Sequence, residues 1–305
     1  MKIAFSLDTV NRVYQEPNIN RVALKFYWDE LFKLIGAGGF KAIEMPFNPS
    51  PRVRTFDPFS KAQVDARYGG IESFKKQLAE AGIEKVAGIF FTPTENVSVD
   101  GFVSGMKETA EKMIAQAKDL GCEDVVISAS PEYHEMKPLL DKKAELLDKL
   151  ASAYSDLADR AGNIRLCIRN EYWGILRGAQ MHEFMSRVSP KVFYCVDLAN
   201  IAVAGEDPVE FIRRAGDRIG CVTLTDTCFE DRDEIWKSPD PMFPRTEATQ
   251  VFRDLGQGAI DLKAVFAALK EVGFAGWATV NNKQSKQVSR GILRAGYALK
   301  AVEEG

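Results

Sequence analysis

The sequence predicts an α/β fold, a (β/α)8 TIM barrel that forms a single domain over residues 1–305. Short apolar runs recur every few tens of residues, and amphipathic helix patterns lie between them. The runs are continuous rather than alternating, which is typical of strands buried on both faces of a parallel sheet. No Gly-x-Gly-x-x-Gly motif follows the first run, so the main signal of an open dinucleotide-binding sheet is missing. Eight strands that alternate with helices therefore favour a closed barrel.

The same patterns place the expected elements along the chain. Strands are expected at residues 3–7, 42–45, 86–91, 125–127, 164–168, 192–196, 219–224 and 277–280. Helices are expected at residues 28–36, 71–81, 106–120, 144–161, 262–272 and 287–302. A further helix begins with Asp207 as N-cap and Pro208 at its first position, and Gly162 ends the helix at 144–161.

Composition and charge exclude several classes of protein. The chain is 46% apolar and carries 40 basic against 43 acidic residues, for a net charge of −3. This balance gives no excess of basic residues that would favour binding to nucleic acid or to an anionic membrane. There is no membrane-spanning run of about 18 apolar residues, and the first residues lack a signal-peptide pattern. Five cysteines without a CxxC pair are typical of reduced thiols, so we expect a cytoplasmic protein.

Polar residues gather where the expected strands end, which is where a parallel barrel carries its chemistry. They are Asp8, Glu44, Asn48, Thr92, Ser128, Ser130, His134, Arg169, Asn170, Glu171, Asp197, Asn200, Thr223, Thr225, Asp226, Asn281 and Lys283. Strand alternation places Arg169 with Glu171, and Asn281 with Lys283, on a common face. Because buried polar groups are costly unless they are used or paired, their convergence predicts a site at this end of the barrel.

Five segments, in order along the chain, resemble one known family. They are GFKAIE at 39–44, VDLANIAVAGEDP at 196–208, LTDT at 224–227, LGQGAIDL at 255–262 and LKEVGFAGW at 269–277. The chain thereby resembles the xylose-isomerase-like TIM barrels of the sugar phosphate isomerase/epimerase superfamily, which include inosose isomerases and dehydratases and ketose 3-epimerases. The resemblance covers most of the chain and is strongest from residue 192 to residue 280.

The resemblance implies a divalent metal held by a Glu on strand five, an Asp on strand six, a His on strand seven and a Glu on strand eight. Carried over by position, Asp197 is retained, while Thr223 replaces the His and Asn281 replaces the second Glu. On strand five the ligand position falls on Glu171 or on Arg169, depending on the register. We therefore expect a partly eroded site of Glu171, Asp197 and Asn281 that holds Mn²⁺ or Mg²⁺, or no metal at all.

The roles expected at the site follow from these positions. Glu171, Asp197 and His134 are the expected catalytic residues, His134 because its pKa lies near neutrality, although a loop histidine is the alternative. Without a metal, Arg169 or Lys283 could supply the positive charge at a developing enolate. The expected substrate-binding residues are Arg169, Trp173, Asn200, Asp226, Asn281 and Lys283. The second histidine, His182, is expected to be a surface or packing residue.

The strand-seven to helix-seven connection, at about residues 228–258, is unusually long, which predicts a lid or an interface, with Trp236 and Phe243 inside it. Aromatic residues such as Trp173, Tyr14 and Phe47 could stack on a sugar or pack in a core.

The sequence thus predicts a sugar, polyol or sugar phosphate isomerase or epimerase that transfers a proton next to a carbonyl, or a related dehydratase. Its partner is a small molecule, and a homo-oligomer is compatible with the sequence. The alternative is a barrel that binds a carbohydrate or a partner protein without catalysis. An abasic-site endonuclease is disfavoured, since that chemistry needs a His-rich metal cluster and a basic groove.

Overall fold

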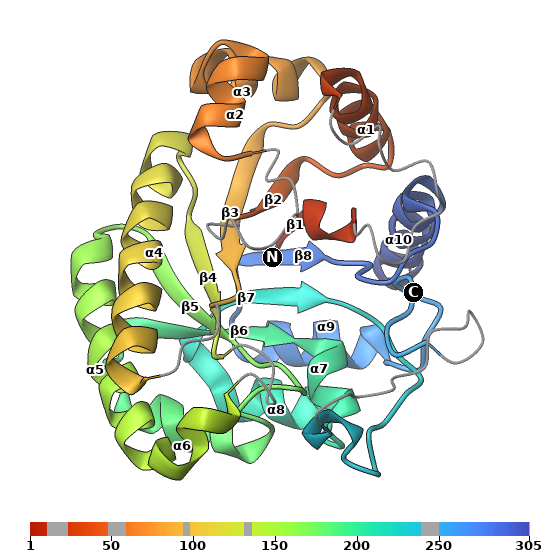
Figure 1. Ribbon diagram of the computed structural model, residues 1–305. Helices are drawn as coiled ribbons and strands as arrows, with labels where there is room; N and C mark the ends of the chain where they lie inside the picture. The colour runs from red at the N-terminus through yellow and green to blue at the C-terminus, as the bar shows by residue number, and fades with distance from the viewer. Residues whose placement is uncertain (11–23, 48–58, 94–97, 131–135, 239–249, 305) are drawn as a thin grey trace.

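The structure is a computed structural model that describes residues 1–10, 24–47, 59–93, 98–130, 136–238 and 250–304. Eight parallel strands close into one barrel in chain order, with helices around the outside (Figure 1). The strands are β1 (Lys2–Ser6), β2 (Ala42–Pro46), β3 (Lys85–Phe91), β4 (Asp124–Ser128), β5 (Arg165–Arg169), β6 (Val192–Asp197), β7 (Ile219–Leu224) and β8 (Trp277–Val280). The predicted (β/α)8 TIM barrel is confirmed.

Helices follow most strands. The α-helices are α1 (Lys25–Ala37), α2 (Lys61–Tyr68), α3 (Ile71–Glu80), α4 (Val99–Leu120), α5 (Lys143–Ala161), α6 (Ala179–Arg187), α7 (Leu198–Val203), α8 (Pro208–Ala215), α9 (Leu262–Glu271) and α10 (Val288–Glu303). Short 3-10 helices are η1 (Leu7–Thr9), η3 (Lys137–Lys142), η4 (Gly216–Arg218) and η5 (Ile235–Lys237). No helix in the described ranges is long and apolar enough to cross a membrane.

Local capping sets several helix boundaries. The Asp207 side chain accepts a hydrogen bond from the Val209 amide, and Pro208 opens α8, as expected. Gly162 ends α5 at a φ of 72°, also as expected. Helix α4 begins at Val99 rather than near Met106, because the Ser98 hydroxyl caps its first turn. The sequence therefore encodes these ends by residue type as well as by periodicity.

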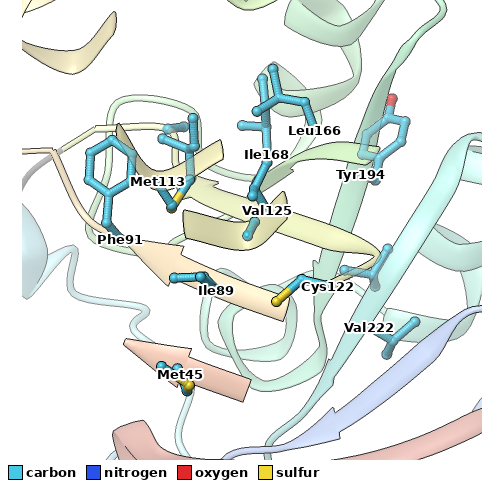
Figure 2. Close-up of a cluster of buried hydrophobic side chains, with 14 of the residues drawn as sticks. Met45, Ile89, Phe91, Met113, Cys122, Val125, Leu166, Ile168, Tyr194 and Val222 are labelled. Atoms are coloured by element: carbon cyan, nitrogen blue, oxygen red, sulfur yellow. The ribbon is translucent and has the colours of Figure 1, made fainter. Parts of the chain in front are cut away.

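One set of alternate strand residues faces outward and forms the main core against the helices. Figure 2 shows part of this core, in which Met45, Ile89 and Ile168 from three strands share a cluster with Met113 of α4. These side chains are fully buried. Burial of such a side chain contributes about 1.5–3 kcal/mol, so this layer is the main source of the barrel's stability.

The other alternate residues face into the barrel. Cys167, Cys195 and Cys221 pack there with Phe90 and Val126. All five cysteines are free, and only Cys228 is exposed. The thiols of the interior act as small apolar groups. Burial raises the pKa of Cys195 well above the ordinary value. The neighbouring Cys167 thiol, together with burial, raises the pKa of Cys221 in the same way.

Two residues further along each strand, towards its C-terminal end, the inward-facing side chains are polar. The register aligns Ser6 with Glu44, Ser128 with Arg169, and Asp197 with Thr223. These residues therefore form one level at the C-terminal ends of the strands. The barrel has an apolar floor beneath a polar mouth, and this layering positions the candidate site.

Candidate active site

Two carboxylates and two cations meet at the ends of β5, β6 and β8. Arg169 Nε lies 2.7 Å from Glu171 Oε1, and Lys283 Nζ lies 2.7 Å from Asp197 Oδ2. Lys283 Nζ is also 3.8 Å from Glu171 Oε2, so the ammonium group stands between the two carboxylates. The structure thus joins four residues from three strand ends into one ion-pair network, which we call the mouth network.

Ser128, at the end of β4, completes the contacts of this network. Its hydroxyl donates to Glu171 Oε1 at 3.0 Å and accepts from Arg169 Nη2 at 3.2 Å. The Asp197 Oδ1 atom accepts from the Asn200 amide at 3.2 Å, so Asp197 also caps helix α7. Each carboxylate of the network is therefore fixed by at least two partners.

The network is buried, and its charges stabilise one another. Burial alone would raise the pKa of Glu171, but Arg169, Lys283 and the Ser128 hydrogen bond outweigh it and hold the pKa below its ordinary value. Burial would lower the pKa of Lys283, but Asp197 and Glu171 outweigh it and raise the pKa. Lys283 and Glu171 are both ionised at neutral pH as a result. The guanidinium of Arg169 stacks over the Phe90 ring at 4.8 Å.

A third carboxyl group, Glu44, lies in the same mouth but outside the network. It is 4% exposed, and Ser6 Oγ donates to its Oε2 atom at 2.8 Å. Burial raises the pKa of Glu44 to about 7, although Arg169, the Ser6 hydrogen bond and Lys283 oppose the rise. Near neutral pH this group is populated in both its acid and its carboxylate form.

Asn281 faces η1 at the start of the chain. Its Nδ2 atom donates to Asp8 Oδ2 at 3.0 Å. Within the described residues, the buried atoms Asn281 Oδ1, Arg169 Nη1 and Thr225 Oγ1 have no hydrogen-bond partner. A buried polar atom without a partner costs about 1–3 kcal/mol. These polar atoms at the strand ends suit the hydroxyl and carbonyl groups of a polar ligand.

The Asp226 side chain, expected to bind substrate, accepts four hydrogen bonds from backbone amides. Its Oδ1 atom accepts from the amides of Thr227 and Ile260, and its Oδ2 atom accepts from those of Gly256 and Gly258. A Cβ atom on Gly258 would lie 2.0 Å from Asp226 Oδ1, so only glycine fits there. The carboxylate holds a turn of the β7–α9 connection, which accounts for its burial without a substrate. Its expected contact with substrate stays a prediction.

Asn200 is likewise held by local structure. Its Oδ1 atom accepts from the Tyr172 amide at 3.0 Å, linking α7 to the segment after β5. Its Nδ2 atom is buried without a partner in the described part of the chain. Trp173, two residues after Glu171, is partly buried against a second apolar cluster of Tyr172, Ala199, Val203, Trp236, Val251 and Phe252. Neither position contradicts the expected contact with substrate, which stays a prediction.

The β7–α9 connection runs from Leu224 to Leu262 and includes η5. Its Phe252 ring lies 4.8 Å from Lys283 Nζ, so the connection covers the ammonium group of the mouth network. The Phe252 amide donates to Gln284 Oε1 at 2.9 Å, which fixes this contact. The described part of the expected lid therefore reaches the site. Phe243, Tyr14 and His134 lie outside the described residues.

Comparison with known proteins identifies the barrel. The family model of the xylose isomerase-like TIM barrel matches residues 32–298. The chain belongs to this family. Inosose dehydratase from Lacticaseibacillus casei is 28% identical over 189 residues, which cover 58% of this chain and 62% of that protein. The matched region thus spans less than two thirds of this relative.

Solved structures share the whole fold. D-psicose 3-epimerase from Clostridium cellulolyticum H10 superposes with a TM-score of 0.68 at 14% identity, covering 100% of this chain and 99% of that one. A structure of the IolI protein with a bound zinc atom superposes with a TM-score of 0.63 at 20% identity, covering 99% and 98% of the two chains. At such identities these likenesses show the fold of the xylose isomerase-like family.

The mouth network does not fit the divalent metal that this family implies. The ammonium of Lys283 stands between Asp197 and Glu171, the two carboxylates that would be ligands. The third expected ligand, Asn281, donates from its amide nitrogen to Asp8. The position at which the resemblance implies a histidine carries Thr223. No group of three His, Cys, Asp or Glu side chains in the described ranges gathers to hold a metal ion. Ion pairs occupy the expected ligand positions.

Three residues of this site carry no distinctive signal of their own in the sequence. Glu44 and Ser128 are two of many polar residues at the strand ends, and Phe252 lies in a long connection without a motif. The signal for Glu44 was alternation, because it lies two residues after the inward-facing Ala42. His182 was correctly expected to pack: its Nδ1 atom lies 3.1 Å from the Tyr194 hydroxyl, and burial lowers its pKa to about 4.

Proposed function

We propose that this barrel is a sugar or polyol isomerase, epimerase or dehydratase that transfers a proton next to a carbonyl group without a bound metal. The observation that carries the proposal is the mouth network, in which a buried ammonium and a buried guanidinium occupy the catalytic end of the barrel. Membership of the xylose isomerase-like family supports the reaction class, and so does the similarity to an inosose dehydratase.

The two cations supply the charge that this chemistry needs. When a base takes the proton from the carbon beside a carbonyl, the C–H electron pair forms a C=C bond and the carbonyl oxygen becomes negative. Fixed positive donors in a site shielded from water stabilise that oxygen. Arg169 Nη1 has no hydrogen-bond partner in the described chain and is available to donate. Glu171 and Asp197 hold Arg169 and Lys283 in place and keep them protonated.

The charge balance favours an uncharged substrate over a phosphorylated one. In the described mouth, the positive charges of Arg169 and Lys283 are matched by the carboxylates of Glu171 and Asp197, with Asp8 adding another acidic group. A phosphate would add negative charge without an unmatched cation to receive it. We therefore propose a neutral ketose or an inosose as the substrate.

Asp197 provides the test of this function. Asp197→Asn keeps an oxygen that can accept from the Asn200 amide but removes the charge that holds Lys283. We expect kcat/KM to fall by about 100-fold. The free energy of unfolding should fall by about 3 kcal/mol, because the buried Lys283 loses the carboxylate that it pairs with. Asp197→Ala also removes the cap of α7, at a cost of about 1 kcal/mol. The measurements are turnover on ketoses and inososes, and the melting temperature. Normal turnover by Asp197→Asn would remove the network from the mechanism.

A second candidate function is a barrel that binds a carbohydrate without converting it. The observation in its favour is that cations neutralise Glu171 and Asp197, while Asn281 stands in place of the second glutamate of the family. It predicts saturable sugar binding with no exchange of carbon-bound hydrogen. The cytoplasmic location, the absence of nucleic-acid partners and the homo-oligomer stay predictions of the sequence.

A further inference from the structure

Glu44 lies across the barrel from Asp197. The strands close in chain order, so β2 and β6 are four strands apart in either direction around the barrel. Both side chains occupy inward positions at the C-terminal level of their strands. A molecule seated in the mouth would therefore have Asp197 and its partner Lys283 on one side and Glu44 on the other. The Arg169 guanidinium lies over Phe90 of β3, the strand next to β2.

The carboxyl group of Glu44 has fewer hydrogen-bond partners among the described residues than the carboxyl groups of Glu171 and Asp197. Ser6 donates to its Oε2 atom, and no other hydrogen bond to the carboxyl group comes from the described residues. In contrast, Glu171 accepts from both Ser128 and Arg169, and Asp197 accepts from Lys283 and the Asn200 amide. Glu44 therefore keeps one oxygen for a ligand.

We propose that Glu44 is the acid–base group that moves the proton in this site, a role that rests on the proposed function. Its carboxylate takes the proton from the carbon beside the carbonyl, and the C–H electron pair becomes the C=C bond of an enediolate. Within the enediolate, the proton of the neighbouring hydroxyl passes to the former carbonyl oxygen, and the carbonyl re-forms at the neighbouring carbon. Glu44, protonated in the first step, delivers a proton to the former carbonyl carbon and returns to its carboxylate form, which completes an isomerisation. In a dehydration it instead delivers the proton to the departing hydroxyl, which leaves as water.

The surroundings of Glu44 support this role. The charged groups that act on it are Arg169 from β5, Lys283 after β8 and Asp8 from η1, while its polar neighbour on β1 is Ser6. On the β3 side it is aligned with Gly88, which brings no charge. Burial raises its pKa to about 7, whereas Glu171 has a lowered pKa. Environments that separate the pKa values of two carboxyl groups are typical of acid–base sites.

The experiment compares Glu44→Gln and Ser6→Ala with the full-length wild type. Solvent deuterium entering the carbon beside the carbonyl is followed by NMR on a panel of ketoses and inososes, as a function of pH. Glu44→Gln keeps the size of the side chain and should lower exchange by at least about 100-fold. The matched control is Glu123→Gln, whose carboxylate binds Lys2 and Lys85 just before β4, at the other end of the barrel, and which should exchange normally.

Ser6→Ala separates an acid–base role from a structural one. The Ser6 hydrogen bond lowers the pKa of Glu44, so its loss should move the limb of the kcat/KM profile near pH 7 to higher pH. Loss of exchange in Glu44→Gln together with this shift supports the proposal. Normal exchange in Glu44→Gln would overturn the role of Glu44 but leave the proposed function standing. So would a pH profile of Ser6→Ala whose limb near pH 7 stays where it is in the wild type. A wild type that exchanges no substrate overturns the proposed function and this role with it.

Discussion

Replacing Lys283 by methionine is expected to slow the proposed reaction by about 10²–10³-fold, the effect of losing one preorganised charge donor. The same change should lower the free energy of unfolding by about 3 kcal/mol, because it leaves buried carboxylates without their cation. Asp197 is fully buried and lies 2.7 Å from Lys283 Nζ. Methionine keeps the approximate length of the side chain but loses the charge, and with it the contact of the ammonium group with the Phe252 ring. Deuterium exchange and urea denaturation measure the two effects.

Lys237→Met is the matched control for this variant. Lys237 also lies over an aromatic ring, 5.4 Å from Trp236, and pairs with Glu234, but its side chain is 46% exposed. An exposed pair contributes little, so its removal should change the free energy of unfolding by less than about 1 kcal/mol. If Lys283→Met proved as stable and as active as Lys237→Met, the mouth network would have neither of its inferred roles.

Asp226→Ala is expected to lower the free energy of unfolding by about 4 kcal/mol, since a charged acceptor is worth about 1.5–3 kcal/mol per hydrogen bond before neighbouring bonds compensate. Four backbone amides would lose their acceptor at once. The Asp226 carbonyl also accepts from the Arg253 amide, which lies next to Phe252. The turn and the aromatic cover over Lys283 should therefore loosen together. Urea denaturation measures the stability change.

The comparison for this variant is Asp261→Ala, in the same connection. Asp261 caps α9 through one hydrogen bond to the Ala264 amide, so its loss should cost about 1 kcal/mol. Equal destabilisation by the two substitutions would show that the four-amide turn is not the anchor of the connection.

The strands could be predicted from the sequence because each is buried on both faces and therefore reads as a continuous apolar run. The expected bounds of β7 and β8 agree with the structure residue for residue. Helices α2 and α7 were not predicted. Helix α2 has a largely polar sequence with two buried residues, Val64 and Tyr68. Helix α7 has six residues, too few to show a helical period, and depends on the Asp197 cap.

The sequence indicated that polar residues gather at the strand ends, but not which of them contact one another. Alternation correctly placed Arg169 beside Glu171, because that pair is local in sequence. The contact of Lys283 with Asp197 joins residues 86 positions apart, which no local pattern reveals. The hydrogen bonds of Asp226 to the turn at residues 256–260 join segments about 30 positions apart, so they too depend on the folded chain. The raised pKa of Glu44 depends on burial and on charges from other strands, so it required the folded barrel.

The central claim is that this xylose isomerase-like barrel transfers protons with its own cations in place of a metal. The most direct measurement is deuterium exchange into ketoses and inososes by protein treated with a chelator, with elemental analysis of the same sample. We predict less than stoichiometric Mn, Zn or Co, and exchange at the rate of the untreated protein. Loss of exchange on chelation, with recovery when one of these metals is added back, would contradict the claim.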